Sequence, residues 1–413
     1  MTPENIFKDV RLELGIDLLS MANLLNLGKN GEHDLALWEE DETLASQLRR
    51  RQAGELIDHV AKIKRDAPLK GALEGKFTFI DLFAGIGGMR LGFQSQGGVC
   101  VFTSEWDKFA QKTYLANYGE VAHGDIRSIK AKDIPEHDVL LAGFPCQAFS
   151  QAGLQKGFYD TRGTLFFEVQ RVLVEKRPKA FLLENVKQLK GHDKGRTLNT
   201  ILSILQGEAP SLPDDIVLSD ETKSALSVPL NYDVRMKVLS SRDYGLPQHR
   251  ERVFIVGFDK DQVSEASREK FKFPQPSGIK TALSDILEDI TDAERAKLTL
   301  SDKLWQGHQL RRKKHAQKGN GFGCNVFQPD APYTVTISAR YYKDGAEILI
   351  DQSHLNMNPR KLSTREALSL QGFSSAFVSS AVSDVQMYKQ SGNAVSVNVI
   401  QAIASEMMKV LEC

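Results

Sequence analysis

Cysteine is scarce in this sequence, and its spacing excludes two kinds of site. The 413 residues contain four cysteines, at positions 100, 146, 324 and 413, and no two of them have the CxxC spacing. Disulfide frameworks and zinc sites need more or closer cysteines, so we expect neither, and we predict no metal. Unpaired cysteines of this kind are typical of the reducing cytoplasm.

Excess charge and long apolar runs are missing as well. The 53 Lys and Arg residues balance 53 Asp and Glu residues, so any site for a polyanion must come from local segregation of charge. No apolar run approaches the roughly 20 residues that cross a bilayer, and the N-terminus lacks the features of a signal peptide. The sequence therefore predicts a cytoplasmic enzyme or regulator with no membrane partner, and its length allows two or three domains.

Residues 1–72 form the first predicted unit, a small helical domain. Apolar residues recur there at helical spacing, and LLSMANLL followed by the turn Gly28–Gly31 resembles a repressor-type helix-turn-helix. The second helix of such a pair would read DNA, but residues 32–42 hold six acidic side chains and no Lys or Arg. Since phosphates repel an acidic helix, a dimerisation or docking domain is the alternative. Residues 66–76, with Pro and two Gly, are predicted to be a linker.

From residue 77 short apolar segments alternate with amphipathic ones. This alternation predicts an α/β, Rossmann-like domain with a mostly parallel sheet covered by helices. We expect strands at 77–83, 99–105, 138–144, 179–185 and 252–258, and helices at 88–97, 107–118 and 163–177. Residues 77–260 and 356–413 would together form this domain.

The predicted insert, residues 261–355, breaks the alternation and is expected to be rich in loops. Its basic run RRKKHAQKGNGFG, residues 311–323, is the best candidate for contact with a polyanion, although a solvated charge run is the commoner case. Helical spacing returns after the insert, which indicates that the chain comes back to complete the first domain.

Glycines and a distant carboxylate suggest a nucleoside site. DLFAGIGG follows the first predicted strand, and Glu105 lies 20 residues after Gly85, at the end of the next strand. A carboxylate at that point can accept both hydroxyls of a ribose, Trp106 could stack on a purine, and Asp125 could accept from an exocyclic amine. The glycine turn carries no basic residue for a phosphate. S-adenosylmethionine therefore fits better than a dinucleotide.

Cys146 lies in the stretch LAGFPCQAFS, directly after the strand predicted at 138–144. A lone cysteine is usually a buried space-filler. Here polar Gln147 and Ser150 favour a loop, and Glu184 ends another predicted strand of the same sheet. The carboxyl ends of the strands in such sheets hold their active sites. A cysteine and a carboxyl group beside an adenosine site predict covalent catalysis on an electrophilic ring.

Seven motifs follow one another in an order that resembles a known family. DLFAGIGG, SEW, GDI, GFPCQAFS, ENV, QHRER and QSGN, over about residues 77–410, resemble the bacterial DNA cytosine-5 methyltransferases. The stretch from GNGFG to TISARYYKDGAEILID resembles the Dcm-like branch. The resemblance implies a Rossmann-like core that uses S-adenosylmethionine and leaves S-adenosylhomocysteine, with double-stranded DNA as substrate and residues 261–355 as the target-recognition domain.

The resemblance also implies the chemistry of individual residues. Cys146 would attack carbon 6 of a flipped-out cytosine as a thiolate, and Glu184 would hold and protonate ring nitrogen 3. Arg252 would contact the cytosine carbonyl oxygen, and Arg250 would take part in catalysis by supporting the same loop. The implied cofactor residues are Phe83, Ala84, Gly85, Gly87, Glu105, Trp106, Asp125, Ile126, Pro145, Leu165, Asn393 and Val395, of which Ile126, Leu165 and Val395 could equally be core.

Contacts with DNA are implied for both domains. The candidates are Gln147, Ser150, Arg311, Arg312, Lys313, Lys314, Lys318, Arg340, Tyr341, Tyr342 and Lys343. The target would be a CCWGG or CCGG type of site, methylated by a monomer that either acts alone or is paired with a restriction endonuclease for the same site. The alternatives are a tRNA cytosine-5 methyltransferase, although the Cys-Phe-Thr signature of those enzymes is absent, and a transcriptional autoregulator acting through residues 1–72.

Overall fold

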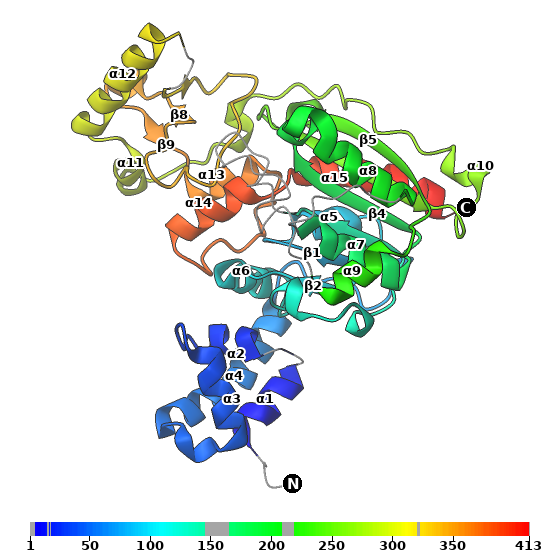
Figure 1. Ribbon diagram of the computed structural model, residues 1–413. Coiled ribbons are helices and arrows are strands. Elements are labelled where there is room, and N and C mark those ends of the chain that lie inside the picture. Colours follow the sequence, from blue (N-terminus) through cyan, green and yellow to red (C-terminus); the bar gives the residue numbers. More distant parts are fainter. Residues whose placement is uncertain are drawn as a thin grey trace.

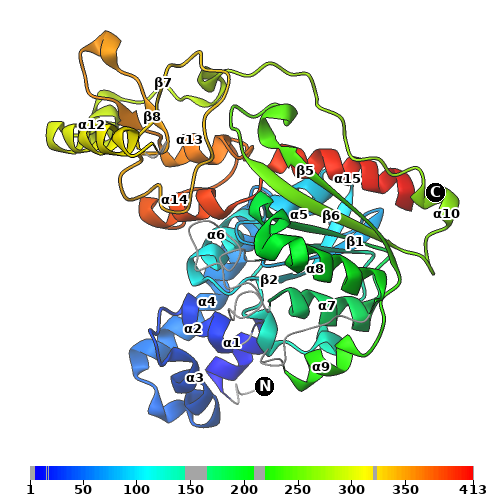
Figure 2. The ribbon, with the colours of Figure 1, turned by 45° about the horizontal axis from the view of Figure 1, so that its top comes forward.

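The chain forms three parts that follow one another in space in the computed structural model (Figure 1). The structure describes residues 5–14, 16, 18–144, 165–208, 219–319 and 323–412. The N-terminal helices lie at one end, a large α/β part is in the middle, and a smaller part with α12 and a short sheet lies at the other end (Figures 1 and 2).

Four helices make up the N-terminal unit, which confirms its helical character. They are α1 (Ile6–Leu14), α2 (Leu18–Leu24), α3 (Gly31–Glu40) and α4 (Gln47–Asp66). Their apolar faces share a core that includes Phe7, Met21, Leu35 and Val60. A helix pair therefore occupies the place of the expected helix-turn-helix, and its role in reading DNA stays a prediction.

A six-stranded sheet forms the centre, in the order β2-β1-β3-β4-β6-β5. β1, β2, β3 and β4 are mutually parallel, and β6 runs antiparallel to both of its neighbours. This confirms the α/β class. The strands are β1 (Phe77–Leu82), β2 (Gly98–Ser104), β3 (Val139–Ala142), β4 (Ala180–Val186), β5 (Tyr232–Ser240) and β6 (Glu251–Asp259). The edge strand β5 was not predicted.

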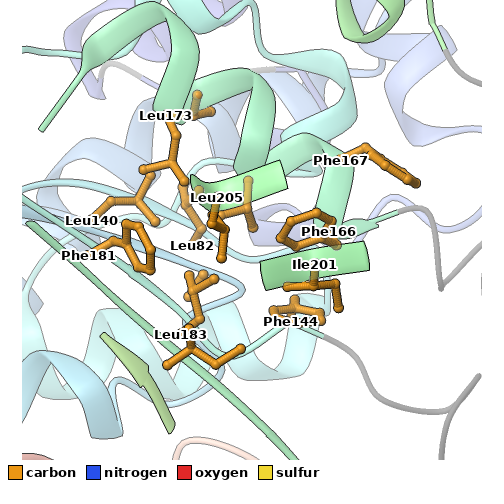
Figure 3. Packing of buried hydrophobic residues seen from close by; sticks show 14 of the residues in the cluster. Leu82, Leu140, Phe144, Phe166, Phe167, Leu173, Phe181, Leu183, Ile201 and Leu205 are labelled. Carbon is orange, nitrogen blue, oxygen red and sulfur yellow. The ribbon is translucent and has the colours of Figure 1, made fainter. Parts of the chain in front are cut away.

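Helices cover both faces of this sheet, because successive residues of each buried strand point to opposite faces. Leu140 and Phe181 pack against α7 (Leu165–Lys176) and α8 (Arg196–Gln206), as Figure 3 shows. Leu141 and Leu182 face the other side of the sheet. There they belong to a second apolar cluster, together with residues of α5 (Gly88–Gln94) and α15 (Val397–Leu411). The remaining helices of this part are α6 (Lys108–Tyr118) and α9 (Asp220–Leu226).

The insert is more helical than expected. The insert was expected to be rich in loops, but residues 311–317 of its basic run belong to α12 (Asp302–Gln317). Ser301 caps the helix by accepting a hydrogen bond from Leu304, and the Lys, Arg, Gln and Ala residues of the run are good helix formers. The other elements of the insert are α10 (Glu265–Arg268), α11 (Asp292–Leu298), β7 (Val326–Phe327) and β8 (Leu349–Ile350). After the insert come β9 (Arg360–Lys361), α13 (Thr364–Ser369) and α14 (Asp384–Asn393).

One stretch, residues 384–411, is long and apolar enough to cross a membrane by length and composition. It is not one continuous helix, since Ala394 and Ser396 between α14 and α15 have extended backbone. Ile400, Ile403 and Met407 of α15 are fully buried in the core beside the sheet. Packing in the core accounts for the apolar character of this stretch.

Close packing across β4 and β6 gives a test of the fold. Gly257 lies opposite Phe181, and a Cβ at Gly257 would overlap the Phe181 ring. Gly257→Ala should lower the free energy of unfolding by about 1–3 kcal/mol, measured by urea denaturation. Gly307→Ala is the matched control, since Gly307 lies in α12 with no atom within 4 Å of an added Cβ, and it should stabilise by about 0.5–1 kcal/mol. Equal effects at both positions would contradict the packing.

Candidate active site

The strand register brings four chain segments to one edge of the sheet. Leu82 of β1 pairs with Ala142 of β3, and Ala142 pairs with Leu183 of β4, so these parallel strands end together. β6 is antiparallel to β4 and Val186 pairs with Arg252, so the first residues of β6 lie at the same edge. This is the carboxyl edge, where open α/β sheets bind their ligands.

Glu184 and Arg252 form an ion pair at this edge. Arg252 Nε lies 3.1 Å from Glu184 Oε1, and Glu184 is 9% exposed. Burial raises the pKa of Glu184 above its ordinary value, and the guanidinium groups of Arg252 and Arg250 partly oppose that rise. A buried carboxyl group beside a guanidinium is suited to exchange a proton with a ring nitrogen.

Pro145, Cys146, Gln147 and Ser150 lie outside the described residues, and the described chain before them leads directly to Glu184. The backbone oxygen of Phe144 accepts a hydrogen bond from Asn185 Nδ2 at 3.2 Å. A Cβ added at Gly143 would lie 3.7 Å from Glu184 Oε2. Gly143 and Phe144, the last described residues before Cys146, therefore lie next to Glu184 and Asn185.

Arg250 is placed to support backbone rather than to touch a ligand. Its guanidinium donates to the backbone oxygens of Ile337, Gly392 and Ala394 at 3.3, 3.2 and 2.7 Å, and the residue is 4% exposed. These bonds tie the start of β6 to the end of α14. The supporting role that the sequence suggested matches this geometry, whereas direct catalysis by Arg250 stays a prediction.

Glu105 joins the glycine turn to the end of β2. Its two carboxylate oxygens accept from Gly85 N and Asp107 N, both at 2.7 Å, and its own N–H donates to the His123 oxygen at 2.8 Å. Glu105 is 6% exposed, and burial raises its pKa to about 7. Since each carboxylate oxygen can accept two hydrogen bonds, the group keeps capacity for hydroxyl donors.

Open space beside Glu105 suits the adenosine of S-adenosylmethionine. Gly85 has φ +56° and a Cβ there would meet nothing within 4 Å, and Trp106 is 66% exposed. Phe83, partly buried, has the positive φ of 57° that begins this turn, and Ala84 N donates to the Ser104 oxygen. A buried carboxylate, an exposed indole and an open glycine turn are the groups that a nucleoside needs.

Gly87 has another explanation. A Cβ at Gly87 would overlap the ring of Tyr118, whose hydroxyl donates to the backbone oxygen of Gly87 at 2.9 Å. The glycine is thus required by packing against α6. Among the remaining cofactor candidates, Ile126 and Val395 are buried, Leu165 is half-buried at the start of α7, and Asn393 is exposed at the end of α14.

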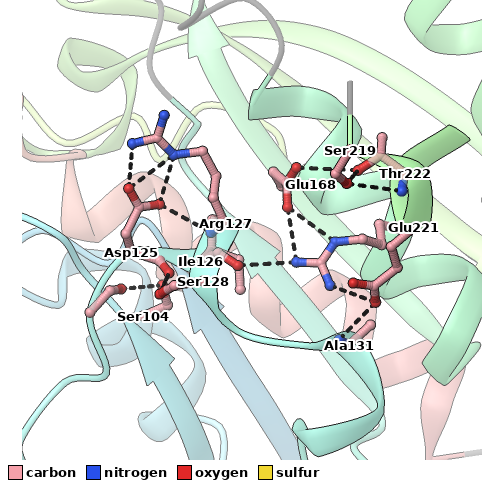
Figure 4. A network of polar contacts seen from close by, with 12 residues as sticks. Ser104, Asp125, Ile126, Arg127, Ser128, Ala131, Glu168, Ser219, Glu221 and Thr222 are labelled. Atoms are coloured by element: carbon pink, nitrogen blue, oxygen red, sulfur yellow. Dashed lines mark hydrogen bonds and ion pairs between the residues drawn. The ribbon is translucent and has the colours of Figure 1, made fainter. Parts of the chain in front are cut away.

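The loop that holds Asp125 is fixed by a polar network (Figure 4). Arg171 of α7 donates to the Ile126 oxygen at 3.0 Å and bonds Glu168 and Glu221. Burial alone would raise the pKa of Asp125, but the hydrogen bonds and charge of Arg127 together lower it below its ordinary value. Asp125 is therefore held as an acceptor beside the turn. Among the described residues, no group of three His, Cys, Asp or Glu side chains could hold a metal ion.

The candidates for DNA contact fall into exposed and buried groups. Tyr341 is fully buried, and its hydroxyl donates to the Ile348 oxygen at 2.6 Å and accepts from Leu362 N, so its prediction as a DNA contact is wrong. Tyr342 is half-buried with the Lys389 amine over its ring. The basic candidates are exposed, namely Arg311, Arg312, Lys313, Lys314, Lys318, Arg340 and Lys343.

Tyr333 and Arg242 were missed by the sequence reasoning. The Arg242 guanidinium lies 5.1 Å from the centre of the Tyr333 ring, and Tyr333 is 41% exposed. His249, three residues before Arg252, makes an edge contact with the same ring and bonds through its N–H to the Thr334 oxygen. An exposed aromatic ring with a cationic partner, next to His249 just before β6, is suited to contact with a nucleic acid at this edge of the sheet. The only sequence signal was the polar, alternating stretch APYTVTIS.

Comparison with known proteins agrees with this geometry. Residues 77–208 and 223–409 match the family model described as C-5 cytosine-specific DNA methylase. The Type II methyltransferase M1.ScrFI of Lactococcus lactis subsp. cremoris is 49% identical over 98% of this chain and 95% of its own. The Type II methyltransferase M.SsoII of Shigella sonnei is 48% identical over 98% of this chain and 97% of its own. The DNA-cytosine methyltransferase of Escherichia coli K12 is 42% identical over 79% of this chain and 76% of its own.

Solved structures confirm the fold class. The structure of the Entamoeba histolytica methyltransferase EhMeth superimposes with a TM-score of 0.62, covering 82% of this chain and 99% of that one at 19% sequence identity. At this identity the likeness concerns the fold alone. It supports the Rossmann-like arrangement in which the site lies.

Burial of Glu105 predicts a pH dependence of stability. The folded pKa of about 7 exceeds the ordinary 4.5, so the folded state holds a proton between these values that the unfolded chain has lost. Stability from this group is present below pH 4.5 and is lost as pH rises to 7. Glu105→Gln should therefore gain stability relative to wild type across that window, by up to about 3 kcal/mol in urea denaturation. Glu74→Gln at an exposed position is the control, and parallel curves for Glu105→Gln would contradict the raised pKa.

Proposed function

The chain belongs to the C-5 cytosine-specific DNA methylase family, and we propose which of its residues perform the reaction. It is a DNA cytosine-5 methyltransferase that takes its methyl group from S-adenosylmethionine. In our proposal Cys146 is the nucleophile, Glu184 the proton donor to the base, and Arg252 the residue that orients it. The observation that carries the proposal is the bond from Asn185 to the Phe144 oxygen, which holds the last described residue before Pro145 and Cys146 beside the strand that carries Glu184.

The proposed reaction starts with the Cys146 thiolate forming a bond to carbon 6 of the cytosine. Glu184 donates a proton to ring nitrogen 3, which neutralises the charge that would otherwise develop on the ring. Carbon 5 then takes the methyl group that S-adenosylmethionine supplies. Loss of the carbon 5 proton to a base expels the Cys146 sulfur as a thiolate and restores the aromatic ring. The proton on ring nitrogen 3 returns to Glu184, so both side chains regain their starting states.

The ion pair between Glu184 and Arg252 fits these two roles. Arg252 has donors beyond the one that faces Glu184, so it can hold the cytosine carbonyl oxygen while it stays near the carboxyl group. The positive charge of Arg252 also stabilises the negative charge that develops on the carbonyl oxygen of the cytosine during the attack. Burial raises the pKa of Glu184 and the two guanidinium groups partly oppose that rise, which suits a group that gives a proton to the base and takes it back.

On the cofactor side, Glu105, Trp106 and Asp125 would bind S-adenosylmethionine. Glu105 would accept from the ribose hydroxyls, and the exposed indole of Trp106 would stack on the adenine. Asp125, held ionised by Arg127, would accept from the exocyclic amine. Glu105 and Trp106 directly follow β2, and Asp125 lies in the loop after α6. The methyl group would therefore reach the cytosine from the side of the sheet that holds β1 and β2.

DNA would approach the same edge from the insert. Stacked bases hide their reactive carbons, so the target cytosine must leave the helix. Exposed Lys and Arg residues of α12 are suited to phosphates, and Tyr333 with Arg242 lies next to His249, just before β6. We further propose that a monomer methylates a CCWGG or CCGG type of site in the cytoplasm. A restriction endonuclease with the same target would be its partner, as the Type II names of its relatives suggest.

Covalent catalysis can be tested by trapping. A duplex whose target carries 5-fluorocytosine cannot lose the atom on carbon 5, so the proposed adduct should persist on a denaturing gel and map to Cys146 by mass spectrometry. Cys146→Ser should bind DNA, form no adduct and lose methyl transfer by at least 1,000-fold, on the order expected for a lost nucleophile. Cys100→Ser is the control and should trap normally. Active enzyme without an adduct would refute the mechanism.

The role of α12 can be tested through the salt dependence of binding. Lys313 and Lys314 are exposed, and replacing both with alanine should weaken DNA binding and reduce the slope of log K against log salt by about 2 if each contacts one phosphate. The matched control replaces Lys130 and Lys132, two exposed lysines near β3, and should leave the slope as it is. An unchanged slope for the α12 variant would mean that its lysines are a solvated face.

A further inference from the structure

Helix α6 lies between the cofactor side of the site and the N-terminal helices. Its residue Gln111 is 5% exposed and has hydrogen bonds in both directions. The Gln111 Nε2 donates to the backbone oxygen of Glu105 at 2.6 Å, and its Oε1 accepts from Asn23 Nδ2, in α2, at 3.4 Å. A single buried amide therefore connects the residue proposed to bind ribose with the N-terminal unit.

Other contacts hold α6 in a fixed position. Thr113 donates to Gln390 Oε1 of α14 at 2.8 Å. Asn117 donates to the Val378 oxygen and accepts from Val378 N, at 3.0 and 2.7 Å. The Tyr118 hydroxyl bonds the backbone of the glycine turn. Because α6 is fixed on these sides, the Gln111 amide acts on Glu105 from a rigid base.

The N-terminal unit covers the same part of α6. Leu115 is buried in the apolar cluster formed by the N-terminal helices, and Lys112 Nζ donates to Asn26 Oδ1 at 2.6 Å. This packing removes Gln111 from solvent, and a buried amide needs partners for both its donor and its acceptor. Asn23 provides one of those partners, so the N-terminal unit helps to fix the rotamer of Gln111.

We propose that Gln111 is a positioning residue for the cofactor and that the N-terminal helices set the affinity for S-adenosylmethionine through it. Glu105 directly follows β2, where the chain turns into α6, and Gln111 closes this turn by holding the Glu105 backbone oxygen. The Glu105 side chain is thereby aimed at Gly85 and at the open space beside it. The proposal rests on the proposed role of Glu105 as a ligand for the ribose.

Gln111→Met removes both hydrogen bonds and keeps the volume and helix propensity of the side chain. In the full chain this variant should raise the Kd for S-adenosylhomocysteine about five- to tenfold in isothermal titration, the effect of one buried hydrogen bond. The KM for S-adenosylmethionine should rise in parallel, while kcat at saturating cofactor and the KM for DNA change by less than twofold. Gln401→Met is the matched control, since it makes the same exchange at an exposed position of α15, and it should bind as wild type.

Asn23→Ala tests the link to the N-terminal unit and should raise the same Kd about two- to threefold, and no rise would refute that link. A lower Tm of Gln111→Met with a wild-type Kd would show a merely structural role and overturn the proposal. If Gln111→Met does not fold, Gln111→Glu tests the same proposal. Its carboxylate would repel the backbone oxygen of Glu105, so the Kd for S-adenosylhomocysteine must rise. A wild-type Kd for S-adenosylhomocysteine in Glu105→Gln would refute the proposed cofactor site itself. A raised Kd in Glu105→Gln together with a wild-type Kd in the Gln111 variants would refute only the role of Gln111.

Discussion

The antiparallel pairing of β6 with β4 is the constraint on which the site depends. It places the first residues of β6 at the edge where the parallel strands end, so Arg252 lies beside Glu184. If β6 were parallel, Arg252 would begin at the opposite edge, roughly 20 Å away at about 3.3 Å per residue. The same register lets Arg250, just before the strand, reach the backbone at the end of α14. One pairing thus supplies the guanidinium of the ion pair and fixes the chain around it.

The two buried carboxyl groups at this edge, Glu184 and Glu105, have different kinds of hydrogen-bonding partner. Glu184 faces a guanidinium on a flexible side chain, and Glu105 faces two backbone N–H groups that cannot move away. Burial raises the pKa of both. A carboxyl group that exchanges a proton during each turnover benefits from a partner that can adjust, whereas one that holds a ribose benefits from a rigid frame. The difference in partners therefore matches the two roles proposed for them.

Strand ends and spacing were predictable from the sequence, because buried strands give apolar runs and the next polar residue marks the edge. Gly85 and Glu105, which are 20 residues apart in the sequence, are joined in the structure by a hydrogen bond of 2.7 Å. Features that depend on distant partners were not predictable. Tyr341 looked like a DNA contact because its neighbours are basic, but its position is set by Ile348 and Leu362. Edge strand β5 has only one neighbour, and its weak alternation did not distinguish it from a loop.

The N-terminal unit lies outside the family match, which begins at residue 77, yet it shares a core with α6 through Leu115. An 11-residue helix gains little stability from its own propensity and depends on what it packs against. The apolar side of α6 that carries Leu115 would face water without the N-terminal helices, at a cost of about 1.5–3 kcal/mol for a fully buried leucine. Since α6 also supports the glycine turn and Glu105, a change in how the N-terminal helices pack reaches the cofactor side without any contact to the cofactor itself.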